Sequence, residues 1–153
     1  MRDDVLLFKD MKPDKDYIKN IFHFDVRKLD GVDGLEISQY CIALSQYLIF
    51  LKYQMNKTKA ELIQKKRFLE SVINQRLTPD IIKSFKTKTN AIDNIIKNSK
   101  TINNLKNEIN PLQDELITLE GLDKTIGELI AAFKRELTRR ENELYRIRQE
   151  RKL

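Results

Sequence analysis

The sequence predicts an all-α protein: an elongated hairpin or bundle of long helices with coiled-coil-like packing, assembled into an oligomer. Two observations lead to this fold class. The chain of 153 residues contains only 4 Gly and 3 Pro, while 34% of its residues are charged and 41% are hydrophobic. Such a composition is typical of long helices joined by few turns. In addition, apolar residues recur at spacings of three and four over much of the chain, as helices with one buried stripe require.

Residues 1–32 are expected to form an N-terminal arm that is partly extended, and residues 33–153 a helical domain for oligomerisation and nucleic-acid binding. Residues 1–36 carry 7 Lys and Arg against 9 Asp and Glu, a net charge of −2. Within the arm, Phe22, Phe24 and Val26 alternate with polar residues and would share one face of an extended segment. The arm is interpreted either as a packed strap or as a segment that docks a partner.

The first long helix is expected over about residues 34–76. Asp33 followed by Glu36 at the third helical position forms a capping box, which places the helix start there. Behind it, apolar residues at helical spacing indicate one buried stripe; they are Ile37, Cys41, Leu44, Leu48, Leu51, Met55, Leu62, Leu69 and Val72.

A second helix is expected over about residues 79–100. Thr78 suits the N-cap, and Pro79 suits the first helical position because the amide hydrogen that it lacks would have no partner there. Asn98, Asn103 and Asn104 are poor helix formers, so we expect this helix to fray at its end.

Asn110 and Pro111 repeat the pattern of cap and proline, which predicts a third helix over about residues 111–152. Alternating steps of three and four from Ile102 to Ile147 visit 14 positions, of which 12 are apolar; the exceptions are Asp123 and Arg140. A 3.5-residue period of this length is typical of a coiled-coil seam. Three apolar stripes on one short chain favour a homo-oligomer, with the following residues at its interface: Leu112, Leu116, Leu119, Ile126, Ile130, Phe133, Leu137, Leu144 and Ile147.

Positive charge is concentrated in the middle of the chain. Residues 57–106 carry 12 Lys and Arg against 4 Asp and Glu, a net charge of +8. Clustered cations bind phosphates by releasing counterions, and Phe68 or Phe85 would either stack on an unpaired base or lie in the core. The residues predicted to bind single-stranded DNA are Lys57, Lys59, Lys65, Lys66, Arg67, Arg76, Lys83, Lys86 and Lys88.

We expect no enzymatic activity, cofactor or metal site. His23 is the single histidine and Cys41 the single cysteine, and no phosphate-binding glycine motif is present. Cys41 is interpreted as a small core residue in a reducing compartment. The most apolar run, residues 40–50, is shorter than the ~20 residues that span a bilayer. We therefore expect a cytoplasmic protein without membrane contact.

The order of features resembles the UvsY-type recombination mediators of T4-like phages. Residues 24–29 (FDVRKL) resemble a short family signature that precedes the first long helix, and residues 139–147 (RRENELYRI) resemble the final helix of that family. The apolar beginning and basic second half of the first helix are also similar. At the end of that helix the family carries paired tyrosines and a glycine, where residues 72–75 read VINQ.

The resemblance implies a ring-like homo-oligomer that binds single-stranded DNA. It further implies contact with a single-strand-binding protein and assistance in loading a RecA-type recombinase. The residues themselves leave a second hypothesis open, in which the chain is a structural coiled-coil scaffold or assembly protein and its basic half only keeps it soluble.

Overall fold

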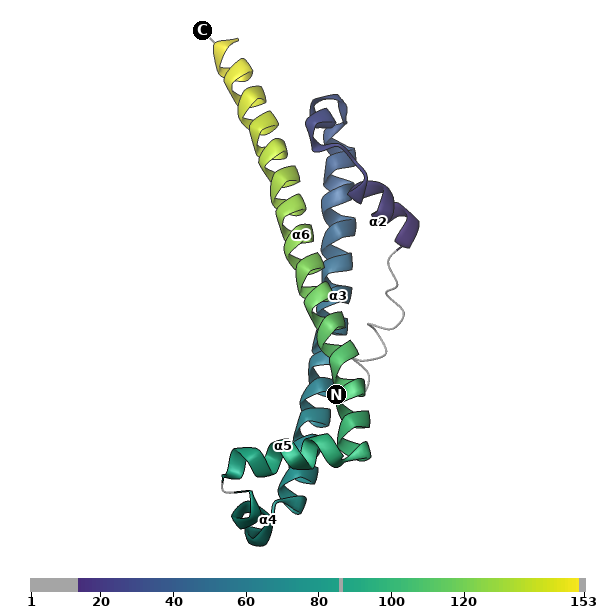
Figure 1. Ribbon diagram of the computed structural model, residues 1–153. Helices are drawn as coiled ribbons and strands as arrows, with labels where there is room; N and C mark the ends of the chain where they lie inside the picture. Colours follow the sequence, from purple (N-terminus) through teal and green to yellow (C-terminus); the bar gives the residue numbers. More distant parts are fainter. Residues whose placement is uncertain (1–13, 86, 152–153) are drawn as a thin grey trace, which may run out of the picture. The chain divides into compact units, whose positions relative to one another are not determined.

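The structure, a computed structural model, describes residues 14–85 and 87–151 and is all-α, with no strand in these residues. Figure 1 shows the helices in chain order. Their bounds are α2 Lys15–Phe22, the 3-10 helix η1 Val26–Gly31, α3 Gly34–Arg76, α4 Pro79–Ser84, α5 Lys88–Asn98 and α6 Lys100–Glu150. No helix in the described part of the chain combines the length and apolarity that crossing a membrane requires.

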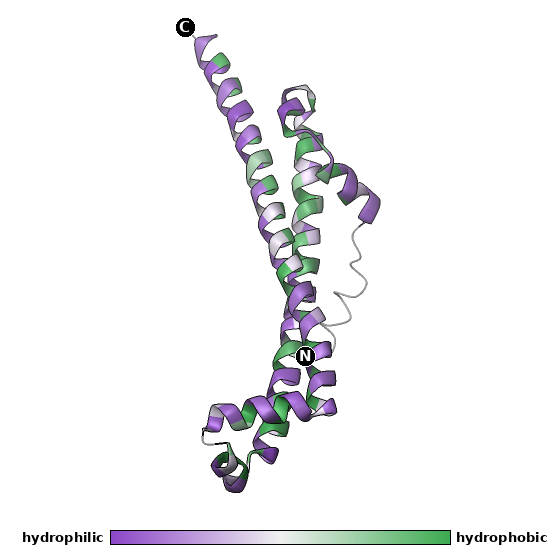
Figure 2. Cartoon of the chain, viewed as in Figure 1, coloured by the Kyte–Doolittle hydropathy of each residue, from purple (hydrophilic) through white to green (hydrophobic). Residues whose placement is uncertain are grey.

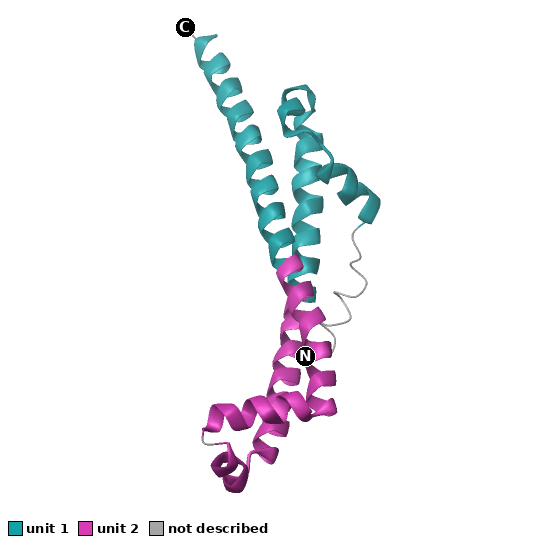
Figure 3. Cartoon of the chain, viewed as in Figure 1, with its two compact units in different colours: residues 1–54, 120–153 teal, residues 55–119 magenta. Residues whose placement is uncertain are grey.

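The chain forms two compact units, which divide it differently from the expected boundary after residue 32 (Figure 3). Unit 1 comprises residues 1–54 and 120–153, so it contains α2, η1, the first half of α3 and the second half of α6. Unit 2 comprises residues 55–119, which include the second half of α3, α4, α5 and the first half of α6. α3 spans Gly34–Arg76, the bounds that the sequence predicts.

In the described part of the N-terminal arm, from Asp14 onward, Phe22 ends α2 and Val26 begins η1, so only residues 23–25 of the predicted extended segment lie outside a helix. Asp14 accepts hydrogen bonds from the amides of Asp16 and Tyr17 and thereby caps α2. Asp25 accepts one from the Arg27 amide and caps η1. An N-cap carboxylate stabilises the first turn of a helix, so these acidic residues start two short helices.

The core of unit 1 is a stripe of α3 packed against a stripe of α6 and covered by the N-terminal helices. Ile37, Leu44, Ile126 and Phe133 are fully buried. Phe133 is also central to an aromatic cluster, in which its ring centroid lies 6.5 Å from that of Phe24 and 5.7 Å from that of Tyr40. Figure 2 shows the apolar residues that build these stripes along both helices.

Cys41 is buried in the same core, as the sequence predicts, and burial raises the pKa of its thiol. The hydroxyl of the preceding residue, Tyr40, donates a hydrogen bond to Glu36. This bond raises the pKa of Tyr40 to about 12, because it stabilises the neutral phenol beside a carboxylate.

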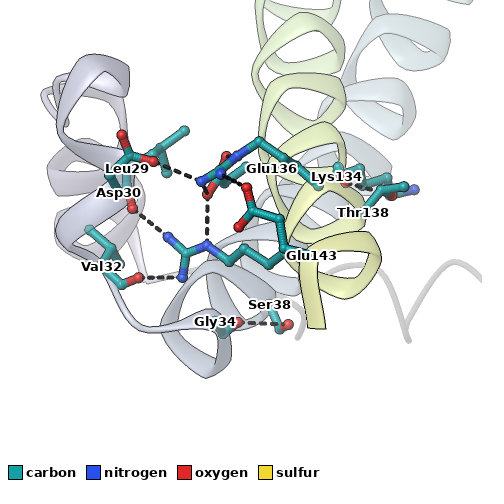
Figure 4. A network of polar contacts seen from close by, with 11 residues as sticks. Leu29, Asp30, Val32, Gly34, Ser38, Lys134, Glu136, Thr138 and Glu143 are labelled. Atoms are coloured by element: carbon teal, nitrogen blue, oxygen red, sulfur yellow. Dashed lines mark hydrogen bonds and ion pairs between the residues drawn. The ribbon is translucent and has the colours of Figure 1, made fainter. Parts of the chain in front are cut away.

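A polar network joins α6 to η1 and to the residue that follows it, Val32 (Figure 4). Arg140 donates hydrogen bonds of 2.6 Å to the Leu29 carbonyl oxygen and 2.7 Å to that of Val32. Arg139 forms an ion pair of 2.8 Å with Asp30, and both arginines pair with Glu136. The pKa of Glu136 is lowered to about 2 because these guanidinium groups stabilise its charged form.

In unit 2, the segment predicted as one helix over residues 79–100 forms two short ones. Thr78 caps α4 with Pro79 in the first turn, as expected. α4 nevertheless ends at Ser84, and Thr87 caps a new helix by accepting a hydrogen bond of 3.2 Å from the Asn90 amide. A threonine side chain that binds nearby backbone competes with a continuous helix, which explains the interruption.

The last long helix begins at Lys100 and continues through Pro111, so the predicted start at residue 111 is wrong. Ser99 caps it instead: its hydroxyl accepts a hydrogen bond of 3.4 Å from the Ile102 amide and another from the Arg76 guanidinium. Pro111 removes one hydrogen bond within the helix. The helix persists because Ile102 and Ile109, on its preceding turns, are buried in the core of unit 2.

The apolar seam of α6 is used largely within the chain. Its positions in unit 2 are buried or half-buried, as are those of unit 1 from Asp123 to Arg140. Of the predicted interface residues, Ile126, Ile130 and Phe133 belong to the core of unit 1, whereas Leu112, Leu116, Leu119 and Leu137 are half-buried. Leu144 and Ile147 alone among them are exposed. The reason is that α3 presents an apolar stripe of its own to this seam.

Candidate nucleic-acid interface

A groove in unit 2 lies between the second half of α3 and the first half of α6. Its volume is about 750 Å³. From α3 it is lined by Lys57, Ala60, Glu61, Gln64, Lys65 and Phe68, and from α6 by Leu105 and Glu108. The groove therefore combines an aromatic ring, an amide and cations, which are the groups that bind an unpaired nucleobase and its phosphate.

Phe68 is the central feature of the groove. Its side chain is 56% exposed, although phenylalanines usually lie in the core. Of the two alternatives that the sequence allows for Phe68, the structure selects the exposed one. Phe85, the other candidate, is half-buried at the C-terminal end of α4 and does not line the groove.

Lys65 is already paired within the chain. Its Nζ donates a hydrogen bond of 2.6 Å to Glu108 Oε2, and this bond raises the pKa of the lysine. A phosphate at this point must displace Glu108. With Glu61 also in the lining, the groove contains two carboxylates and two ammonium groups. The lining of the groove is therefore close to neutral. Its distinguishing feature is the exposed ring of Phe68, not its charge.

The other predicted cations of α3 are distributed around the helix. Successive residues of a helix are rotated by about 100°. Arg67 therefore lies at the edge of the groove, on the side of Ala60, whereas Lys66 lies on the opposite side of α3 from Lys57. Lys59 shares the far face with Lys66 and is half-buried. Only Lys57 and Lys65 line the groove itself.

Of the remaining predicted residues, Arg76 ends α3, and the others belong to the segment that connects α3 and α6. Arg76 donates a hydrogen bond to Ser99 and has a structural role at the junction of three helices. Lys83 on α4 and Lys88 at the start of α5 are exposed. Lys86 lies outside the residues that the structure describes.

The net positive charge of the protein coincides with unit 2. Residues 55–119 carry 12 Lys and Arg against 7 Asp and Glu, a net charge of +5, which leaves +1 of the total of +6 for unit 1. A compact unit with this excess of cations attracts polyanions at long range. The groove with Phe68 is thus part of the basic unit.

Sequence reasoning missed Gln64, Glu61 and Glu108 as parts of this site. Gln64 carries no charge, and Glu108 follows Lys65 by 43 positions, so no local pattern indicates their proximity. No known protein family, curated protein or solved structure matches the chain. The features of the site itself are therefore the basis for its function.

Proposed function

We propose that unit 2 binds single-stranded DNA, with an unpaired base against Phe68 and phosphates on the cations that surround the groove. The observation that carries this proposal is the exposed Phe68 in an open groove within the unit that holds +5 of the net charge of +6. An aromatic ring beside cations is the combination that sequence-tolerant single-strand binding uses.

Each group at the groove has a distinct part in the proposed complex. The face of Phe68 stacks on a base, and such stacking contributes about 1–3 kcal/mol per base. The Gln64 amide supplies a donor and an acceptor for the edge of that base. Lys57 and Arg67 contact the backbone on either side, whereas Lys65 contributes only when it leaves Glu108. The binding involves no covalent chemistry.

The test compares the two faces of α3. A Lys57→Ala/Arg67→Ala variant is titrated with oligothymidylate over a range of salt concentrations. Loss of two phosphate contacts should weaken binding and reduce the slope of log K against log salt by about 1.4. Phe68→Ala should weaken binding by tenfold or more with little change in slope, because stacking releases no counterions.

Lys66→Ala is the matched control, since Lys66 is an exposed lysine of the same helix on the side away from the groove. It should retain the affinity of the wild type to within about threefold. Equal loss in Lys66→Ala and in the groove variants would show a diffuse electrostatic surface. No loss in Phe68→Ala would remove the groove from the proposal.

We further propose that this binding serves recombination in the cytoplasm, with a ring-like homo-oligomer helping a RecA-type recombinase onto strands covered by a single-strand-binding protein. The support is the resemblance of residues 24–29 and 139–147. In the structure, these two segments meet through the hydrogen bond from Arg140 to the Leu29 carbonyl oxygen, and Asp25 caps a helix, so each segment also has a structural role. The test is whether the protein shortens the lag of recombinase assembly on covered strands.

A structural coiled-coil scaffold is the second candidate function. It is favoured by an apolar stripe on the outer face of α3, where Leu35, Ile42 and Ile49 are 68%, 60% and 49% exposed. A scaffold would self-associate and show no binding to oligothymidylate even at low salt, where phosphate contacts are strongest. Binding that weakens in the groove variants would favour the first function.

A further inference from the structure

The groove of unit 2 contains two carboxylates that a site for phosphates alone would not need. Glu61 lines it from α3 and Glu108 from α6. Glu108 accepts a hydrogen bond of 2.6 Å from Lys65, whereas Glu61 is exposed and accepts no hydrogen bond from the residues that the structure describes. An unpaired carboxylate beside a DNA strand repels its phosphates. Glu61 therefore favours binding only where the strand presents hydrogen-bond donors to it.

Glu61 lies in one row of α3 with two other residues of the groove, Gln64 and Phe68. Their spacing of three and four residues places them on the same side of the helix. At the rise of an α-helix, Gln64 lies about 6 Å along the axis from Phe68, and Glu61 about 10 Å. Side chains of a helix lean towards its N-terminal end, so the ring of Phe68 leans towards these two residues. A base that stacks on the ring therefore extends its edge over Gln64 towards Glu61.

The polar groups of this row can distinguish the four bases by their Watson–Crick edges. The Gln64 amide can donate a hydrogen bond, and the carboxylate of Glu61 can accept two side by side. Guanine alone presents an acceptor, O6, next to two donors, N1–H and the 2-amino group. Thymine has a second acceptor in place of the amino group, and adenine and cytosine have an acceptor in place of N1–H. Each of these three bases would bring a lone pair against the carboxylate.

We propose that the groove selects guanine over the other bases of DNA, and that Glu61 makes the selection. The guanine ring stacks on Phe68. The Glu61 carboxylate accepts hydrogen bonds from N1–H and from the 2-amino group, and the Gln64 amide donates one to O6. The hydrogen bonds from the base replace water on the carboxylate, so the negative charge of Glu61 assists the binding of this one base and opposes that of the other three.

This inference rests on the proposed binding of single-stranded DNA and specifies the base that the groove takes. Stacking on Phe68 and contacts to phosphate are common to every base, so they supply affinity without selection. Glu108 is the less suitable carboxylate for reading the base, because one of its oxygens already accepts the hydrogen bond from Lys65. Affinity and selection therefore depend on different residues, and the two proposals can fail separately.

The test compares short oligothymidylates of about five nucleotides, near the lower limit for single-strand sites, that differ only in the central base. Titration of the full chain at one salt concentration gives the dissociation constant of each. A central guanine should bind at least about tenfold more tightly than thymine, the selectivity of a good bidentate contact. A central hypoxanthine, which lacks only the 2-amino group of guanine, should lose most of this preference.

Two variants of equal charge test the role of Glu61. Glu61→Gln should reduce the preference for guanine to about twofold, because an amide offers one acceptor and turns a donor towards the second donor of the base. Glu70→Gln removes the same charge from the opposite side of α3 and should keep the preference of the wild type. Both residues are exposed, and circular dichroism verifies that each variant is folded. Phe68→Ala should weaken the binding of both oligonucleotides.

Equal affinity of the wild type for guanine and thymine would overturn the selection of guanine. DNA binding in the groove would still stand if Phe68→Ala weakened both complexes. Hypoxanthine that binds as tightly as guanine would attribute the preference to purine stacking and overturn the contact to Glu61. So would an unchanged preference in Glu61→Gln. Absence of binding to every oligonucleotide would overturn the proposed function and this inference together.

Discussion

Arg140 Nη2 donates a hydrogen bond of 2.6 Å to the carbonyl oxygen of Leu29, 111 positions earlier in the chain. Leu29 is buried, and its carbonyl belongs to η1, a short 3-10 helix that ends two residues later. Arg140 thus satisfies backbone acceptors at the end of a helix, a position that otherwise needs water or a cap. This contact explains one of the two polar positions in the apolar seam of α6.

Arg140→Leu should destabilise unit 1, although it makes the seam more regular. It removes the guanidinium donor from the Val32 carbonyl oxygen and leaves that of Leu29 with the Val32 amide alone. The loss should cost about 1.5–3 kcal/mol, as for hydrogen bonds to charged groups. Denaturant unfolding measures the loss, and amide exchange should quicken over residues 26–32. Arg148→Leu, an exposed position farther along α6, should change stability by less than about 0.5 kcal/mol. Equal effects of both variants would contradict a specific role of Arg140.

Asp123→Leu should act in the opposite direction. Asp123 is the other polar position in the seam, and its Oδ1 is buried without a hydrogen-bond partner among the residues that the structure describes. Replacing it by an apolar residue removes an unsatisfied acceptor, and stability should rise by about 1–3 kcal/mol. Asp123→Asn, which keeps a polar group there, should gain little. A loss of stability in Asp123→Leu would show that the carboxylate has an essential partner.

The stability of unit 1 should fall with acid in a window that Glu136 determines. Its pKa is about 2 in the folded protein against an ordinary value of 4.5, because Arg139 and Arg140 bind the carboxylate. The charged form is thus favoured by folding, so its contribution is complete above about pH 4.5 and disappears as pH falls towards 2. Glu136→Gln should flatten this part of the curve of melting temperature against pH. If the melting temperature of Glu136→Gln falls with acid as steeply as that of the wild type, the loss of stability is due to other carboxylates.

Removing Glu108 should strengthen DNA binding if the groove functions as proposed. Glu108→Gln breaks the ion pair with Lys65 and leaves an ammonium group available to phosphate. The slope of log K against log salt should then steepen by about 0.7, the value for one added contact to a single strand. Glu70→Gln is the control, because Glu70 is exposed on the side of α3 away from the groove. Equal gains in both variants would indicate a general effect of charge.

Local capping chemistry was the part of the fold that could be read from the sequence. Thr78 and Pro79 predict a helix start, and α4 begins there with Thr78 as its N-cap. Asn110 and Pro111 show the same local pattern, yet α6 passes through them. The difference is tertiary: buried Ile102 and Ile109 hold the turns before Pro111 on the core of unit 2.

The candidate site could be predicted only in part for a related reason. Lys57 and Lys65 were found from charge, which is a local property of the sequence. Whether Phe68 is buried, and which cation is neutralised, depends on the face of α3 that α6 covers. Glu108 settles the second question, and its pairing with Lys65 joins turns that are distant in sequence.

Pro111→Ala should therefore stabilise unit 2. Pro111 is exposed in the interior of α6, where it lacks the amide hydrogen that would bind the Asn107 carbonyl oxygen. A proline in a helix interior costs about 3 kcal/mol relative to alanine. The substitution also raises the conformational entropy of the unfolded chain. This lowers the free energy of unfolding by about 0.4–1 kcal/mol and so opposes the gain.

We expect a net increase of about 2 kcal/mol in the free energy of unfolding, seen as a higher denaturant midpoint with an unchanged slope. Asn110→Ala, at the neighbouring exposed position, is the matched control and should gain no more than the ~0.7 kcal/mol of its helix propensity. The two variants separate the missing hydrogen bond from helix propensity in general. An unchanged free energy of unfolding in Pro111→Ala would contradict the prediction. It would mean that the restored amide of residue 111 forms no hydrogen bond within α6.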